Sequence, residues 1–305
     1  MSPFRRPLLT AILTSMLWPA AHAQYGSPSS LKDEMGTAQD LYFSKDPAGE
    51  LTKVALANTL HVPASSTSPV PVLLILPTCS GISQHIHEWT QAALQAGYGV
   101  MAVDSLRYLG NDCGSPSKIS NGRYVKDALD AVAFVTQQPG VEPQRVAVLG
   151  FSKGALIATW LASGTVADTL RPNTPRISAS VSVYGFCALG PTRGRPQGIT
   201  ILQPDTDRPF LALMGAKDNE LPPRSCLELL PKLKAAGAPV QWHVYEQAGH
   251  AWDSQDKHGF SKTTVTTGER ITYQYDPDVT QDSRKRVFDF LQQSVQAVPK
   301  GALPQ

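Results

Sequence analysis

The sequence has no excess of charge of either sign, no long apolar run and no recognisable metal-binding motif. Its 305 residues include 27 lysines and arginines and 25 aspartates and glutamates, which gives a formal net charge of +2. This balance provides no electrostatic attraction for nucleic acid or an anionic membrane, so neither is expected as a partner. No stretch approaches the roughly 20 apolar residues of a transmembrane helix, and we expect no membrane insertion. An H-E-x-x-H motif and other clustered metal ligands are also missing, so no bound metal is expected.

The amino terminus has the pattern of an export signal. Arg5 and Arg6 form a basic start, residues 8–17 are mostly apolar, and Ala21-His-Ala23 has the small-residue pattern of a cleavage site. We therefore predict a signal peptide at residues 1–23, a mature chain that begins at Gln24, and a periplasmic or secreted location. Cleavage removes two of the 27 basic residues, so the mature chain is formally neutral.

The mature chain, residues 24–305, is expected to form a single domain, because its length suits one α/β unit and it contains no internal repeat. Its four cysteines form no C-x-x-C pair, and in an exported protein an even number favours two disulfides over a metal site. Three pairings are possible. Their positions after successive predicted strands favour Cys79 with Cys113 and Cys187 with Cys226, and free buried thiols are the alternative.

Apolar runs alternate with helical patterns along the chain, which indicates an α/β fold with a mostly parallel central sheet and helices on both faces. The predicted strands are residues 70–76, 98–103, 145–149, 177–186, 210–214 and 240–245. The helix before the last strand contains Pro231, which should kink it or delay its start. Residues 51–62 are expected to add antiparallel strands at the sheet edge, and residues 257–282 a hairpin or irregular excursion before a closing helix.

The most specific motif is Gly150-Phe-Ser152-Lys-Gly154, which follows an apolar strand and leads directly into a helix of small residues. This is the context of a nucleophile elbow, a strained turn that projects the serine hydroxyl above the sheet. The flanking glycines allow neighbouring backbone to approach closely. Ser152 is therefore the candidate nucleophile, and the alternative is a glycine-rich connector with a solvated serine.

A serine nucleophile needs a base and a group that orients the base. In the α/β-hydrolase chain order these follow the serine as an acid and then a histidine. His250 lies in a small-residue loop just after the last predicted strand, and Asp218 follows the preceding strand at its carboxyl end. We therefore predict a triad of Ser152, His250 and Asp218. The rivals for the two partner roles are His243, His258, Glu220, Asp205 and Asp207.

The oxyanion that develops during acyl transfer requires backbone N–H donors. One donor is expected at Lys153, directly after the nucleophile, and the other in the loop after the first parallel strand. Cys79 is the first choice for this second donor and Ser80 is the alternative. A disulfide at Cys79 would also stiffen the loop.

Taken together, these segments resemble the dienelactone hydrolase family of the α/β-hydrolase superfamily. The segments that carry the resemblance are Pro77–Gly81, Ala96–Ser105, Gly150–Gly154, Leu213–Asp218, Lys234–Val240, Gly249–Ala251 and Tyr275–Pro277. The resemblance implies one hydrolase domain that cleaves esters or lactones with neither a metal nor an organic cofactor. Founding members of the family carry cysteine as the nucleophile where this chain has Ser152, and Pro77-Thr78 replaces their usual His-Gly. We therefore do not transfer the dienelactone substrate to this chain.

The leading hypothesis is an exported serine hydrolase that acts on a small-molecule ester or lactone through an acyl-enzyme intermediate. A peptidase or an acyltransferase would use the same residues, and a non-catalytic binding protein would retain only the scaffold. The presence of Ser152, Asp218 and His250 in the expected order argues against a decayed site. The sequence makes no prediction of the oligomeric state.

Overall fold

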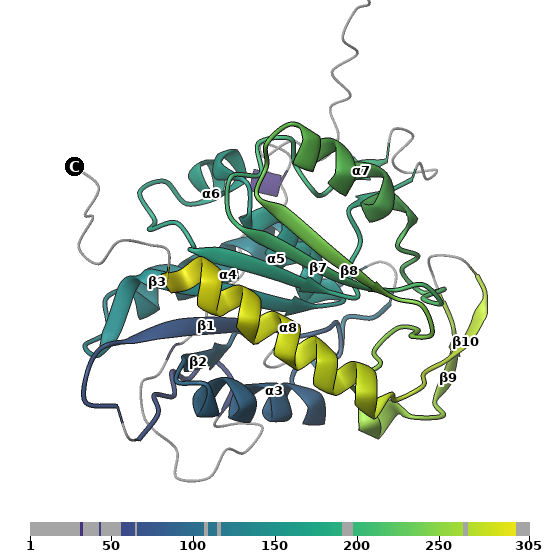
Figure 1. Ribbon diagram of the computed structural model, residues 1–305, viewed down its shortest axis with the longest axis horizontal. Helices are drawn as coiled ribbons and strands as arrows, with labels where there is room; N and C mark the ends of the chain where they lie inside the picture. The colour runs from purple at the N-terminus through teal and green to yellow at the C-terminus, as the bar shows by residue number, and fades with distance from the viewer. Residues whose placement is uncertain are drawn as a thin grey trace, which may run out of the picture.

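The centre of the structure, a computed structural model, is a six-stranded parallel sheet (Figure 1). The structure describes residues 31–32, 43, 56–64, 66–106, 109–114, 117–190, 198–264 and 268–296, so the predicted signal peptide at residues 1–23 lies outside the described residues. The strands are β1 (Val70–Leu76), β2 (Gly99–Ala102), β3 (Val141–Phe151), β4 (Ala179–Val183), β7 (Phe210–Gly215) and β8 (Val240–Tyr245). Their spatial order is β2-β1-β3-β4-β7-β8.

Helices cover both faces of this sheet, which confirms the predicted α/β fold. One face carries α3 (Gln84–Gln95) and α8 (Pro277–Gln296), which crosses in front of the sheet in Figure 1. The other face carries α4 (Asn121–Val135), α5 (Lys153–Leu161), α6 (Gly164–Leu170) and α7 (Arg224–Ala235).

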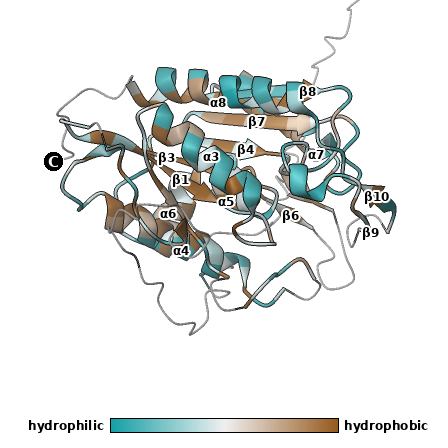
Figure 2. Cartoon of the chain, turned by 90° about the horizontal axis from the view of Figure 1, so that it is seen from below, coloured by the Kyte–Doolittle hydropathy of each residue, from teal (hydrophilic) through white to brown (hydrophobic). Residues whose placement is uncertain are grey.

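Strand β1 shows why the sequence reads as an uninterrupted apolar run. Leu73 and Ile75 pack in the cluster that contains Trp89 of α3, whereas Val72 and Leu74 pack in the cluster that contains α4 and α5. Successive side chains of a strand point to opposite faces, so a strand covered on both faces must be apolar at every position. Figure 2 shows β1, β4 and β7 mostly in brown, whereas α3 and α8 carry much teal.

Two small antiparallel pairs extend beyond the central sheet. They are β5 (Ala188–Leu189) with β6 (Ile199–Thr200), and β9 (Ser261–Thr263) with β10 (Arg270–Thr272), which follow the short helix η1 (Gln255–Lys257). The second pair is the predicted hairpin within residues 257–282. The closing helix α8 nevertheless begins inside that range, at Pro277. Proline suits the first turn of a helix because the backbone N–H that it lacks would have no helical partner there.

Two further expectations need correction. Of residues 51–62, where strands were predicted, residues 51–55 lie outside the described residues. Residues 56–62 do not form strands but contact the sheet edge through isolated bridges, from Ala57 to Ala102 and from His61 to Val100. Helix α7 begins at Arg224 and continues through Pro231, so of the two predicted effects of the proline, a kink or a delayed start, the delayed start does not occur. The apolar face of α7 is buried against β7 and β8, and this burial offsets a cost of about 3 kcal/mol for an internal proline.

Within the described ranges, no helix is both long enough and apolar enough to cross a membrane.

Candidate active site

Ser152 lies at the turn between β3 and α5, where its backbone is strained. Its φ of 52° and ψ of −108° lie outside the conformations that residues with a side chain normally adopt. A Cβ atom on Gly150 would lie 2.1 Å from the carbonyl oxygen of Gly154, and a Cβ atom on Gly154 would lie 2.0 Å from that of Leu76. Both glycines are therefore required by close backbone contacts, and the predicted strand, turn and helix around the serine are present.

Two further strand ends bring Asp218 and His250 to Ser152. Asp218 follows β7 and His250 follows β8, and because these strands run parallel to β3, their carboxyl ends meet at one edge of the sheet. His250 Nε2 lies 2.9 Å from Ser152 Oγ, and His250 Nδ1 lies 2.7 Å from Asp218 Oδ2. All three residues are buried. The structure thus joins the three predicted residues in one hydrogen-bonded chain.

The loop that carries Asp218 fixes the direction of its carboxylate. The Oδ1 atom accepts hydrogen bonds from the backbone N–H of Glu220 at 2.9 Å and of Leu221 at 2.8 Å. Oδ2 is left to face His250 Nδ1. A carboxylate can only accept, so the ring proton belongs on Nδ1, and Nε2 is free to accept from the hydroxyl of Ser152.

The rival residues make other contacts. His243 packs against Tyr245, and His258 accepts a hydrogen bond from the backbone of Tyr275. Asp205 accepts a hydrogen bond from Ser163, and Asp207 forms an ion pair with Arg176. Glu220 differs from these four, because its Oε2 lies 3.8 Å from His250 Nε2. Asp218 therefore lies against Nδ1 of His250, and Glu220 lies beside the other ring nitrogen.

The electrostatic surroundings of His250 favour its protonated form. Burial works against the charged ring, but the charge and hydrogen bond of Asp218, together with the charge of Glu220, outweigh it. They raise the pKa of His250 above its ordinary value of 6.5, while Lys262 acts in the opposite direction. These surroundings thus stabilise the protonated ring of His250.

The loop after β1 carries both candidates for the second oxyanion donor. The N–H of Ser80 donates to Thr78 Oγ1 at 3.2 Å, and the N–H of Gly81 donates to the carbonyl oxygen of Thr78 at 3.0 Å. The N–H of Cys79 makes no hydrogen bond to the residues that the structure describes. Of the two candidates, Cys79 therefore has the N–H that is available to a ligand.

The predicted disulfide pairing is present, with Cys79 bonded to Cys113 and Cys187 bonded to Cys226. The first disulfide ties the loop after β1 to the segment after β2. The carbonyl oxygen of Cys79 also accepts a hydrogen bond of 2.7 Å from the N–H of Asp112. A disulfide and a backbone hydrogen bond thus both tie Cys79 to the segment after β2.

The side chain of Lys153 contacts helix α4. Its Nζ donates to Asn121 Oδ1 at 2.8 Å and lies 5.0 Å from the centre of the Tyr124 ring. The N–H of Lys153 belongs to the first turn of α5, where backbone donors lack helical acceptors. The predicted role of Lys153 as an N–H donor is compatible with this position.

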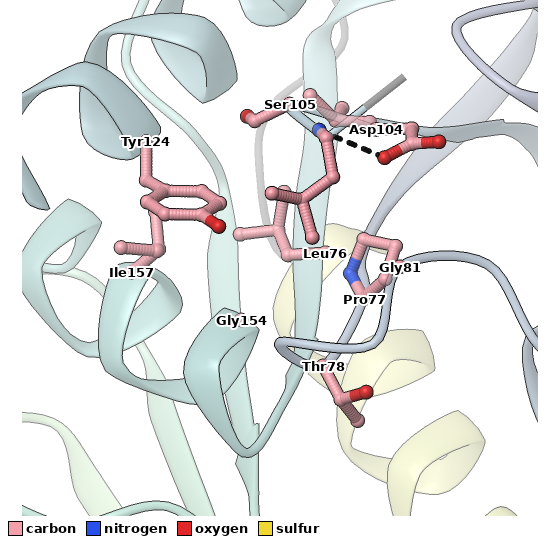
Figure 3. Close-up of a pocket in the computed structure, with 11 residues that line it drawn as sticks. Leu76, Pro77, Thr78, Gly81, Asp104, Ser105, Tyr124, Gly154 and Ile157 are labelled. Carbon is pink, nitrogen blue, oxygen red and sulfur yellow. Dashed lines mark hydrogen bonds between the residues drawn. The ribbon is translucent and has the colours of Figure 1, made fainter. Parts of the chain in front are cut away.

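A small pocket lies against the loop after β1 and is shown in Figure 3. Its lining residues include Pro77, Thr78 and Gly81 from the loop, and Tyr124 from α4. Asp104 also lines it, and its Oδ1 accepts a hydrogen bond of 2.9 Å from the N–H of Leu106. The lining does not include the Ser152, His250 and Asp218 chain, so this pocket adjoins the loop and is not the proposed site of reaction.

Residue Asp253, which the sequence analysis did not single out, binds Tyr184, and the ring of Tyr184 in turn contacts His250. Its carboxylate is fully buried and accepts hydrogen bonds from Trp89 Nε1 at 2.7 Å and from the Tyr184 hydroxyl at 2.9 Å. The Tyr184 ring packs edge-on against His250 at a centroid distance of 4.9 Å. Burial and the charge of Asp253 raise the pKa of Tyr184, so its hydroxyl remains a donor.

The sequence analysis also missed Lys262 and Tyr273, which bind Glu220 beside His250. Lys262 Nζ donates to Glu220 Oε1 at 2.6 Å, and the Tyr273 hydroxyl donates to Glu220 Oε2 at 2.6 Å. Both come from the β9–β10 hairpin and the residue after it. Strands of three residues are too short to show a period, so no sequence signal pointed to them.

Comparison with known proteins identifies the family of this chain. A family model described as the dienelactone hydrolase family matches residues 56–295. A protein of Escherichia coli (strain K12) named "Putative carboxymethylenebutenolidase" is 26% identical over 216 residues, which cover 68% of this chain and 76% of that protein.

Solved structures of low sequence identity share the fold. A thermophilic esterase from Thermogutta terrifontis with bound propionate is 16% identical, with a TM-score of 0.56 and coverage of 79% of this chain and 90% of that one. A dienelactone hydrolase-like promiscuous phosphotriesterase from metagenomic libraries is 19% identical, with a TM-score of 0.56 and coverage of 77% and 91%. The family match spans all six strands of the central sheet and the three residues of the hydrogen-bonded chain. The chain belongs to the dienelactone hydrolase family.

Proposed function

We propose that the protein is a serine hydrolase that cleaves a carboxylic ester or lactone of a small molecule. The observation that carries the proposal is the hydrogen-bonded chain from Ser152 through His250 to Asp218, which begins at a strained strand-to-helix turn. Membership of the dienelactone hydrolase family supports ester or lactone hydrolysis. The names of the relatives, a carboxymethylenebutenolidase and an esterase, agree with this class of bond.

In the acylation step, Ser152 Oγ attacks the carbonyl carbon of the substrate while His250 Nε2 takes the hydroxyl proton. Asp218 holds the ring and stabilises the imidazolium, without itself becoming protonated. The tetrahedral intermediate then expels the alcohol oxygen, which receives the proton from Nε2. The products of this step are an acyl-Ser152 ester and an alcohol, which remains attached to the acyl group if the substrate is a lactone.

In the second step, water replaces the alcohol. His250 Nε2 takes a proton from the water as its oxygen attacks the acyl carbon, and then returns the proton to Ser152 Oγ. The acid is released and the enzyme is regenerated. Each bond change in the two steps uses protein groups and water.

The oxyanion of both tetrahedral intermediates is assigned to the backbone N–H groups of Cys79 and Lys153. Cys79 is preferred to Ser80 because the N–H of Ser80 is already bonded to Thr78. One such donor contributes about 2.7–4 kcal/mol to transition-state stabilisation. The disulfide to Cys113 holds this donor in place before substrate binds.

The enzyme is exported as a single domain, residues 24–305, after cleavage of the signal peptide at residues 1–23. Two disulfides support an oxidising location, which is the periplasm or the cell exterior, because cytosolic thiols are normally kept reduced. The catalytic residues extend from Ser152 to His250 within one sheet, which supports one catalytic domain.

The proposal is tested by labelling the mature protein with a fluorophosphonate and locating the adduct by mass spectrometry. Hydrolysis of p-nitrophenyl esters of increasing acyl length is measured beside the label. We expect an adduct on Ser152, and Ser152→Ala should lose both the adduct and turnover. Ser66→Ala, at an exposed serine, is the matched control and should keep both. If folded protein with both disulfides shows neither turnover nor adduct, the chain is a non-catalytic member of the fold.

A further inference from the structure

Two carboxylates of one loop flank the imidazole of His250. Asp218 Oδ2 lies 2.7 Å from Nδ1, and Glu220 Oε2 lies 3.8 Å from Nε2, the nitrogen that also contacts Ser152. The orienting role of Asp218 belongs to the triad, but the triad does not require Glu220. A second carboxylate beside the reacting nitrogen therefore calls for its own explanation.

The position of Glu220 is fixed by two donors from another part of the chain. Lys262 Nζ binds Oε1 and the Tyr273 hydroxyl binds Oε2, each at 2.6 Å. The side chain of Glu220 is 14% exposed, so water does little to solvate it. Burial opposes its ionisation, but the charge of His250 and the bonds from Lys262 and Tyr273 lower the pKa of Glu220. The carboxylate is therefore charged at neutral pH and held at a constant distance from the ring.

That distance permits attraction without competition for the reacting nitrogen. At 3.8 Å the contact exceeds hydrogen-bond length, so Nε2 remains bonded to Ser152 Oγ at 2.9 Å. A charge at this separation still favours a protonated ring. Tyr273 closes the same side of the site, with its ring centre 6.1 Å from that of His250. When Nε2 gains a proton, Glu220 is thus the nearest carboxylate on that side of the ring.

The groups around the pair are of both signs. The titratable and charged groups that face His250 or Glu220 are Asp218 after β7, Tyr184 after β4, Lys257 of η1, Lys262 of β9 and Tyr273 after β10. The two lysines offset part of the negative charge of the two carboxylates. Removal of Glu220 and removal of Lys262 must therefore change the field at His250 in opposite directions.

We propose that Glu220 is a positioning residue for His250, which holds the ring toward Ser152 and stabilises its protonated form, and that Lys262 and Tyr273 set the strength of this effect. The inference rests on the proposed function, in which His250 is the base. It assigns a role to the β9–β10 hairpin, which brings the Lys262 side chain to the catalytic loop.

The test is the pH dependence of kcat/KM for a p-nitrophenyl ester, measured with Glu220→Gln, Lys262→Gln and the matched control Glu228→Gln. Glu228 lies on α7, where it is exposed and paired with Arg224. The unprotonated ring is the active base, so activity rises with pH through the pKa of His250. We expect Glu220→Gln to move this rise to lower pH by about one unit, because an opposite charge within 4–6 Å typically shifts a pKa by about 1–3 units.

Lys262→Gln should move the same rise to higher pH, because it removes a positive charge that opposes protonation. Glu228→Gln should leave the midpoint unchanged. A loss of packing or of stability alone would lower kcat without opposite shifts of the midpoint. Lys262→Gln lies on a short hairpin and serves as an independent test if Glu220→Gln fails to fold.

Opposite shifts support the inference. In the contrary result, the midpoints of both variants stay within about 0.2 pH units of the wild-type value while Ser152 still reacts with fluorophosphonate. This result would overturn the role of Glu220 and leave the proposed serine hydrolase intact. A wild-type protein with neither turnover nor adduct would instead refute the proposed function, and with it the role assigned to Glu220.

Discussion

Replacing Asp218 by asparagine tests how the catalytic ring is oriented, because the structure dictates how the new amide must lie. Oδ1 accepts hydrogen bonds from the N–H groups of Glu220 and Leu221. An asparagine must keep its oxygen there, since a flipped amide would place NH₂ against two N–H donors. The NH₂ group would then face His250 Nδ1 at the position where Oδ2 now lies, 2.7 Å away.

This contact reverses the direction of the hydrogen bond. Nδ1 would have to accept a hydrogen bond from the amide, so the ring proton would move to Nε2 and point at Ser152 Oγ. The histidine could then no longer take the serine proton, although every heavy atom had kept its place. Comparable loss of the correct tautomer in a catalytic triad lowers kcat by about 10⁴-fold, which corresponds to about 5 kcal/mol of transition-state stabilisation.

The assay is hydrolysis of a short p-nitrophenyl ester at pH 8, with KM measured separately from kcat. We expect kcat to fall by about 10⁴-fold and KM to change by less than about threefold, because the amide has the same size as the buried carboxylate that it replaces. The control is Asp205→Asn, the same change at an exposed carboxylate that accepts hydrogen bonds from Ser163 and Thr165. This variant should keep its activity within about twofold.

A result in which Asp218→Asn keeps more than about a tenth of the wild-type kcat would refute the reasoning. It would mean that His250 does not depend on Asp218 for its tautomer. Thermal unfolding of both variants must be measured, so that a loss of fold is not mistaken for a loss of chemistry.

Three further results are expected. Gly154→Ala should lower the free energy of unfolding by about 3 kcal/mol and abolish fluorophosphonate labelling, because the new Cβ atom would lie 2.0 Å from the Leu76 carbonyl oxygen. If the variant is fully active and equally stable in thermal unfolding, the geometry of the turn at Ser152 is contradicted. Replacing Cys79 and Cys113 together by serine removes a crosslink across 34 residues. The change should lower the free energy of unfolding, measured with denaturant, by about 3–4 kcal/mol and lower kcat more than KM. An unchanged kcat would show that the disulfide does not hold the oxyanion donor of Cys79 in place. The folded site raises the pKa of His250, and the proposed base is the neutral ring, so kcat/KM should fall as the pH drops through a midpoint above 6.5. A midpoint below 6.5 would show that the effect of burial on this pKa outweighs the effect of the two carboxylates.

The central part of the fold could be predicted from the sequence because each signal had a short-range cause. Strand β1 is covered on both faces and is therefore apolar throughout. Gly150 and Gly154 mark a turn that no larger residue permits. The meeting of Asp218 and His250 with Ser152 followed from one topological rule, that parallel strands present their carboxyl ends at one edge.

The remaining features depend on long-range contacts that leave no periodic pattern. The choice between Cys79 and Ser80 required the position of the Thr78 hydroxyl, which bonds the Ser80 N–H. The approach of Lys262 to Glu220 spans 42 residues and depends on a hairpin with strands of three residues. Residues 51–62 were predicted to form strands, yet the bridges at Ala57 and His61 are isolated.

The spacing of the hydrogen-bonded chain along the sequence has a consequence for how activity appears during folding. Ser152 and His250 are separated by 98 residues, and Asp218 and His250 by 32. Their side chains can meet only once β3, β4, β7 and β8 have paired, and contacts between residues so far apart in the sequence are typical of slow folding. A polypeptide that has not yet completed β8 lacks the base altogether. Recovery of turnover after dilution from denaturant should therefore follow the completion of the whole sheet, and the enzyme can report the last stage of its own folding.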